Sequence, residues 1–161
     1  MGATPPPDDE RWLRRAVELA IANVDQGGGP FGAVVLYDGR EIATGQNRVV
    51  RDNDPTAHAE ILAIRAACRA LGTYSLRGAT IYSSCEPCPL CLGAVMWSRA
   101  DRMVYAADRH DAMRAGFDDR EFYDLLARDP AGWPTPVVAH RVPGCTVPME
   151  RWLARGDRIA Y

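Results

Sequence analysis

The spacing of apolar residues in the first part of the chain predicts a helix followed by a β-hairpin. Over residues 12–24 the apolar side chains recur at the three- and four-residue intervals of an amphipathic helix. The run Gly27-Gly28-Gly29-Pro30 then ends that helix. Residues 31–37 form an apolar run typical of a buried strand, Asp38-Gly39 is a strong hairpin turn, and residues 41–45 are the expected return strand.

Strands and helices are predicted to alternate further along the chain, after a polar, loop-like run over 46–55. The expected elements up to residue 106 are a helix over 58–71, a strand over 79–83, a helix over 88–98 and a strand over 102–106. Beyond it, the weaker pattern predicts a helix over 118–128, a strand over 137–142 and a short helix over 149–155. The strand–helix–strand unit at 79–106 implies a parallel pair with a right-handed crossover.

This pattern predicts an α/β fold whose sheet is part antiparallel hairpin and part parallel. A length of 161 residues favours one domain, which we expect over 11–161. The Pro- and Asp-rich residues 1–10 are expected to be a mobile leader.

Charge and composition narrow the classes of partner. The formal net charge is −2 and the sequence pI about 5.9, whereas nucleic-acid-binding domains usually carry a basic face. We therefore expect a small-molecule substrate and no nucleic acid. The chain has no run of about 18 apolar residues, so no membrane partner is expected. No secretion signal is visible in the first residues, which predicts a cytoplasmic location.

Two short motifs carry the chemistry of the sequence: His58-Ala59-Glu60, and Cys88 and Cys91 in a Pro-Cys-x-x-Cys run. Together they match the known signature of zinc-dependent base deaminases. A hydrolytic zinc site needs three protein ligands and an open position for water, and one imidazole with two thiolates meets that need. Each motif begins a predicted helix, where free backbone N–H groups stabilise thiolates. Glu60 is then placed to take a proton from the activated water.

Other interpretations of the cysteines remain open at this point. Cys85, Cys88 and Cys91 begin an iron–sulfur-like spacing, but no fourth cysteine follows at short range. A closed structural zinc site would need a fourth ligand, for which Cys85 is the nearby candidate. The coincidence of both motifs at helix starts favours the hydrolytic site.

Three stretches resemble the cytidine and deoxycytidylate deaminase superfamily: PTAHAEILAIRAAC at 55–68, SSCEPCPLCLGAVMWSRA at 83–100 and RMVYAA at 102–107. Within it, the chain is most similar to the short bacterial guanine deaminases. That narrower resemblance rests on GGPFGAVV near residue 30, GQN at 45–47, AGFDD at 115–119 and the C-terminal aromatic residue. It implies a three-layer α/β/α fold with a mixed five-stranded sheet.

The resemblance also implies roles for individual residues. It makes His58, Cys88 and Cys91 the ligands of one Zn²⁺ per chain, and Glu60 and Asp119 the catalytic carboxylates. The residues it implies for substrate binding are Phe31, Asn47, Ala59, Trp97 and Tyr161. It further implies a homodimer in which residues 132–161 form a swapped C-terminal arm.

These expectations lead to one hypothesis of function and several alternatives. The hypothesis is zinc-dependent hydrolysis of a free nucleobase, guanine giving xanthine and ammonia. Cytosine, an ammeline-like triazine or a nucleoside (guanosine or cytidine) are alternative substrates of the same chemistry. A tRNA adenosine deaminase would share the zinc signature but would need clustered basic residues, and a non-catalytic zinc module would need a filled fourth ligand position.

Overall fold

The computed structural model describes residues 8–161, which divide into two compact units, one ending at Asp119 and one spanning Arg120–Tyr161. Most of the expected leader, residues 1–7, lies outside the described part of the chain. Residues 8–10, which were also expected to belong to this leader, instead form the start of the first helix. Asp8 caps that helix by accepting a hydrogen bond from the Arg11 N–H. The acidic residues at 8–10 therefore belong to a helix start, where they complement the helix dipole.

The first unit is built on a four-stranded sheet of order β2-β1-β3-β4. The strands are β1 (Gly32–Tyr37), β2 (Arg40–Gln46), β3 (Ala79–Cys85) and β4 (Arg102–Ala107). Strand β1 pairs antiparallel with both β2 and β3, whereas β3 and β4 are parallel. The mixed sheet is confirmed, but it has four strands among the described residues and not the expected five.

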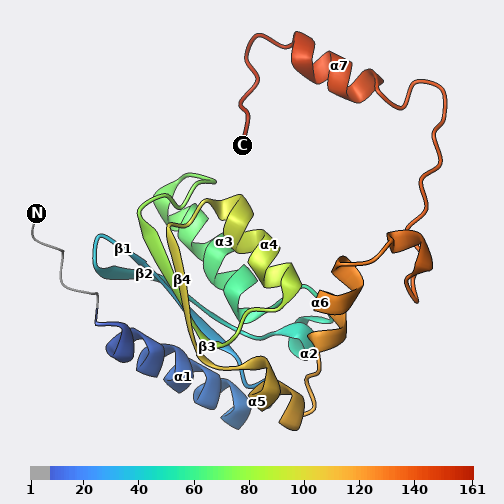
Figure 1. The fold of residues 1–161 in the computed structure, drawn as a ribbon. Helices are drawn as coiled ribbons and strands as arrows, with labels where there is room; N and C mark the ends of the chain where they lie inside the picture. The colour runs from blue at the N-terminus through green and yellow to red at the C-terminus, as the bar shows by residue number, and fades with distance from the viewer. Residues whose placement is uncertain (1–7) are drawn as a thin grey trace, which may run out of the picture. The chain divides into compact units, whose positions relative to one another are not determined.

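Helices cover both faces of this sheet, which confirms the three layers (Figure 1). Helix α1 (Asp9–Asp25) packs on one face, and α3 (Ala59–Leu71) and α4 (Pro89–Ser98) on the other. Alternation along the strands divides the core accordingly, because successive side chains point to opposite faces. Ala33 and Val35 of β1 join the α3 side, while Val34 and Leu36 join the α1 side.

Two glycines allow helices to approach the sheet backbone closely. A Cβ at Gly32 would lie 2.4 Å from the carbonyl oxygen of Ala16 in α1. A Cβ at Gly45 would lie 2.0 Å from the carbonyl oxygen of Ala59, the first residue of α3. Real side chains do not tolerate such distances, so each glycine fixes one helix at backbone contact with its face of the sheet.

Two short helices were not expected from the sequence. Helix α2 (Val49–Asp52) lies in the run predicted to be a loop, and α5 (Arg109–Arg114) follows β4. Asp108 caps α5 by accepting hydrogen bonds from the N–H groups of His110 and Asp111. Both helices have fewer than two turns, too few for hydrophobic periodicity to reveal them.

The second unit contains α6 (Arg120–Leu126), a 3₁₀ turn at Pro130–Gly132 and α7 (Val147–Ala154). The prediction of a strand over 137–142 is wrong, since these residues pair with no strand in the described structure. Prolines at 134, 136 and 143 surround the segment and lack the N–H donors of a ladder. In residues 8–161, no helix has the length and apolar character needed to cross a bilayer.

Candidate active site and metal centre

One edge of the sheet gathers the segments that carry the expected site residues. The register pairs Gly32 at the start of β1 with Gln46 at the end of β2, and Cys85 at the end of β3 with Ala107 at the end of β4. Because β1 runs antiparallel to β3, its start lies at the edge where β3 and β4 end. Residues that flank these strand ends therefore meet, as expected for ligand sites in α/β sheets.

Two helix starts at this edge present the metal ligands. His58 is the N-cap of α3 and Cys88 is the N-cap of α4, both with extended backbone. Cys91 lies in the first turn of α4 and is fully buried. Free N–H groups and the positive end of each helix dipole therefore surround the two sulfurs.

The three ligand atoms form a cluster of the size that zinc requires. Nδ1 of His58 lies 3.4 Å from the Sγ of Cys88 and 3.4 Å from the Sγ of Cys91, and all three atoms lie within 4.8 Å of one another. Tetrahedral zinc with ordinary Zn–N and Zn–S bonds places such atoms about 3.6 Å apart. The donor set of one imidazole and two thiols therefore fits Zn²⁺ in both chemistry and spacing.

Electrostatics at the cluster favour a thiolate on Cys88. Its hydrogen bond with Cys91, supported by His58, lowers the pKa of Cys88 to about 4 against the opposing effect of burial. The same hydrogen bond and burial raise the pKa of Cys91, which keeps the shared proton. The hydrogen bond with Cys88 raises the pKa of His58. A thiolate is the form in which cysteine binds a metal.

Glu60 lies beside this cluster in the first turn of α3, with only 5% of its surface exposed. The Ser83 hydroxyl donates a 3.0 Å hydrogen bond to its Oε1, and the Cys91 thiol donates a 3.4 Å hydrogen bond to its Oε2. Burial raises the pKa of Glu60 above its usual value, which favours proton binding. The structure thus brings together a metal-ligand cluster and a carboxylate able to move a proton.

Asp119, the last residue of the first unit, lies close enough to the Cys88 thiolate for its pKa to be affected. Burial and then the Cys88 charge raise its pKa. Among the described residues, its buried Oδ1 has no hydrogen-bond partner. A buried carboxylate oxygen without a donor is uncommon in proteins, which makes Asp119 a candidate functional residue.

The residues expected to bind substrate differ in their surroundings. Phe31 and Asn47 are adjacent, since the Asn47 N–H donates to the Phe31 carbonyl at 3.1 Å, and Phe31 also makes an edge contact with Phe117. Ala59 is fully buried between His58 and Glu60. Trp97, at the end of α4, is 62% exposed, with the Arg99 guanidinium 5.7 Å from its ring centroid. Tyr161 belongs to the second unit and is exposed there.

A partly buried ion pair next to the metal ligands was missed by sequence reasoning. Arg109 at the start of α5 binds both carboxylate oxygens of Glu86, through Nη2 at 2.6 Å and Nε at 3.0 Å. Its backbone N–H also donates to Glu86, and the Glu86 N–H donates to the Ala107 carbonyl. The segment that leads to Cys88 is thereby attached to the end of β4. Arg109 and Glu86 are 23 positions apart in the sequence, so no local motif could have predicted that they pair.

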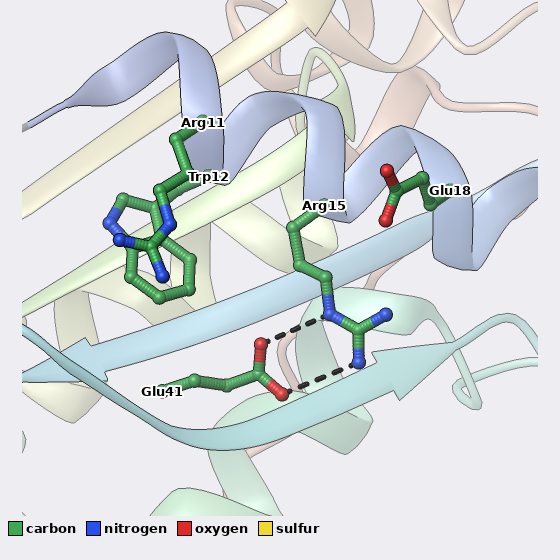
Figure 2. Close-up of a pocket in the computed structure, with 5 residues that line it drawn as sticks. All are labelled: Arg11, Trp12, Arg15, Glu18 and Glu41. Atoms are coloured by element: carbon green, nitrogen blue, oxygen red, sulfur yellow. Dashed lines mark hydrogen bonds and ion pairs between the residues drawn. The ribbon is translucent and has the colours of Figure 1, made fainter.

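A hollow of about 430 Å³ lies elsewhere, along α1 and the edge strand β2. Figure 2 shows it lined by two arginines, two glutamates and a tryptophan, with Arg15 bound to Glu41. It contains none of the expected site residues. Its two arginines and two glutamates balance in charge, which gives no preference for an anion or a cation.

Residues 6–107 match the family model of the cytidine and deoxycytidylate deaminase zinc-binding region. The chain is 56% identical to the guanine deaminase of Bacillus subtilis (strain 168) over 94% of this chain and 98% of the relative. It is 42% identical to a tRNA-specific adenosine deaminase of the same organism, over 62% of each chain.

Solved structures give the same pattern. The X-ray structure of guanine deaminase from Bacillus subtilis matches with a TM-score of 0.92 and 45% identity, over 94% of this chain and 98% of that one. A structure of guanine deaminase from Nitrosomonas europaea matches with a TM-score of 0.65 and 36% identity, over 80% and 75%.

Proposed function

Because this chain belongs to the cytidine and deoxycytidylate deaminase family, we propose that it hydrolyses guanine to xanthine and ammonia. The observation that carries the proposal is the His58–Cys88–Cys91 cluster with the buried carboxylate of Glu60 beside it. The choice of guanine is supported by a relative of that activity which matches this chain over nearly its whole length.

In the reaction, water adds to the ring carbon that bears the amino group and ammonia leaves. His58, Cys88 and Cys91 would hold the zinc ion, which when bound would supply Lewis acidity and lower the pKa of water. The protein's part is to hold the base and to move protons between the water, the ring nitrogen and the departing amine.

We assign the proton transfers to Oε2 of Glu60. Its Oε1 is held by the Ser83 hydroxyl, so the carboxylate cannot rotate without losing that hydrogen bond. Oε2 accepts a hydrogen bond from the Cys91 thiol, which a thiolate at Cys91 would no longer donate. Oε2 then becomes the oxygen able to accept and return a proton, and Ser83 orients it.

We assign binding of the base to the residues around this cluster. The Asn47 side chain accepts a hydrogen bond from the Val49 N–H through Oδ1, which directs its amide nitrogen toward other acceptors such as those of a purine. Phe31 and Trp97 would supply aromatic surface, and Asp119 would accept from the amino group that is lost. Ala59 would contribute its backbone.

The remaining expectations stay proposals of the same kind. We propose that the protein is a homodimer and that residues 132–161 form an arm exchanged between subunits, with Tyr161 closing the partner's site. A cytoplasmic location also remains a prediction.

The test is ammonia release by purified, zinc-replete protein from free bases, nucleosides, triazines and tRNA. Guanine as the preferred substrate supports the proposal. Preference for cytosine, a triazine or a nucleoside keeps the zinc chemistry but overturns the choice of substrate. Release from tRNA alone, or from nothing in the panel, overturns the proposal.

A matched pair of variants tests the role of Glu60. Glu60→Gln should abolish turnover while one zinc per chain is retained. Glu41→Gln makes the same chemical change at a half-exposed glutamate of β2 and should leave turnover near that of wild type. Activity near that of wild type in zinc-loaded Glu60→Gln would refute the proton-transfer assignment.

A further inference from the structure

Asn23, near the end of α1, is a fully buried polar residue that the reaction does not explain. Its amide nitrogen donates two hydrogen bonds of 2.8 Å, one to the carbonyl of Gly29 and one to the carbonyl of Asn47. One side chain on α1 is therefore hydrogen-bonded to two loops that are 18 positions apart in the sequence. Both loops lie at the end of the sheet that carries the candidate site.

The hydrogen bonds around Asn23 form a closed ring. The Gly29 carbonyl also accepts from the Phe31 N–H at 2.8 Å, and the Phe31 carbonyl accepts from the Asn47 N–H at 3.1 Å. The Asn47 carbonyl in turn accepts the hydrogen bond from the Asn23 amide, which closes the ring. Loss of the Asn23 amide would detach Gly29 and Asn47 from α1, so the two residues proposed to hold the base would keep only their backbone hydrogen bonds within the ring.

Packing and the backbone lock the amide in place. The Asn23 carbonyl accepts from the Gly28 N–H at 2.8 Å, and a Cβ at Gly28 would lie 2.4 Å from the amide nitrogen. The loop thus lies directly on the side chain, and only glycine at position 28 permits it. This close packing leaves the Asn23 amide a single orientation, as a residue that positions its neighbours requires.

The geometry also carries a cost that stability alone does not explain. Within residues 8–161, the Oδ1 of Asn23 is buried and accepts no hydrogen bond. Leaving a buried acceptor unpaired is unfavourable. Both amide hydrogens of Asn23 are donated to the two carbonyls, while its Oδ1 stays without a donor.

We propose that Asn23 is a positioning residue for substrate: it fixes Phe31 and Asn47 relative to each other and so shapes the wall against which the base binds. This inference rests on the proposed function, since it assumes that these two residues contact the base. It assigns Asn23 no contact with substrate and no part in proton transfer.

The test uses Asn23→Asp, which keeps the shape but replaces the donor with an oxygen that faces two carbonyls. We expect KM for guanine to rise at least tenfold with kcat within threefold of wild type and one zinc per chain, since loss of uniform binding raises KM alone. Asn23→Ala removes the donor without adding charge and should behave alike, which keeps the test valid if the aspartate variant does not fold.

Gln46→Ala is the matched control. The Gln46 side chain also donates an amide hydrogen bond to α1, at 2.8 Å to the Leu19 carbonyl, but it holds neither Gly29 nor Asn47. Its KM should stay within threefold of wild type. An unchanged KM in both Asn23 variants, or an equal rise in Gln46→Ala, would overturn the proposal.

Amide hydrogen exchange separates this proposal from the proposed function. In the Asn23 variants the amides of Phe31 and Asn47 should exchange at least tenfold faster, while that of Ile81 in β3 is unchanged. Failure of wild type to release ammonia from guanine would refute the proposed function only. Exchange would then decide the role of Asn23: selective acceleration supports it, and no acceleration or equal acceleration at Ile81 overturns it.

Discussion

One added methyl group at Gly45 would test how closely a helix must approach the sheet for the metal ligands to meet. The Cβ of Gly45→Ala would lie 2.0 Å from the Ala59 carbonyl oxygen and 2.7 Å from the Ala63 nitrogen. An ordinary contact needs about 3.4 Å, so α3 and β2 must separate by roughly 1.4 Å. Both obstacles are backbone atoms, so no rotation of a side chain can relieve the contact.

The expected displacement of α3 would move a metal ligand. Ala59 follows His58 directly, so movement of α3 shifts the imidazole relative to Cys88 and Cys91 on α4. Zinc bonds tolerate deviations of about 0.2 Å, far less than the required movement. Overpacking of this kind costs about 1–3 kcal/mol, equivalent to about 2–12 °C in Tm for a chain of this size. We expect zinc affinity to fall at least tenfold as well.

Gly32→Ala is the matched control, because its Cβ would strike the Ala16 carbonyl at 2.4 Å on the opposite face. It should cost similar stability while displacing α1 and leaving the metal ligands in place. Thermal unfolding and competition for zinc with a chromogenic chelator measure the two effects. Equal zinc affinity in the two variants would refute the reasoning that α3 transmits the strain to the site.

Three further predictions follow from other contacts. Arg109→Ala should cost about 1–3 kcal/mol in urea unfolding, since it removes the guanidinium from the partly buried Glu86 and leaves only the backbone N–H of residue 109 as its donor there; Arg109→Lys should recover only part, and full recovery would show that charge alone matters. The Arg102 hydrogen bond lowers the pKa of Asp9 below its usual 3.8, so Asp9 stabilises the fold above that value and loses its effect as the pH falls through the lowered pKa. The difference in Tm between wild type and Asp9→Asn should therefore shrink from pH 7 to pH 3, and a constant difference would contradict the ion pair. Removing zinc with a chelator should lower Tm and restoring zinc should reverse the change, whereas an unchanged Tm would argue against ligation by both helices.

The parts of the fold that the sequence predicts are those with long, uninterrupted patterns. Helices α1 and α3 were predicted within a few residues, because apolar periodicity and a glycine after each helix mark them. The strand expected at 137–142 is wrong because an apolar run identifies a strand only if a neighbour pairs with it. The missed helix α5 depends on capping by Asp108, a local signal too short to stand out.

The candidate site divides in the same way. The metal ligands and Glu60 could be found because their spacing in the sequence reflects helix starts. Ser83, Asn23 and the Glu86–Arg109 pair could not, because each acts on a group at least 23 positions away or on a backbone carbonyl. The assignments of Phe31 and Asn47 came from family resemblance, and their roles remain predictions.

The metal ligands lie on both sides of β3 in the chain, with 30 positions between His58 and Cys88. A bound ion would therefore close a loop that contains all of α3 and β3. If it restricts the unfolded chain as a disulfide does, closing 30 residues removes about 3–4 kcal/mol of chain entropy. The loop includes β3, which pairs with strands on both of its sides. A metal captured early would thus shorten the search for the sheet's central pairing, and refolding should be faster with zinc present than after its late addition.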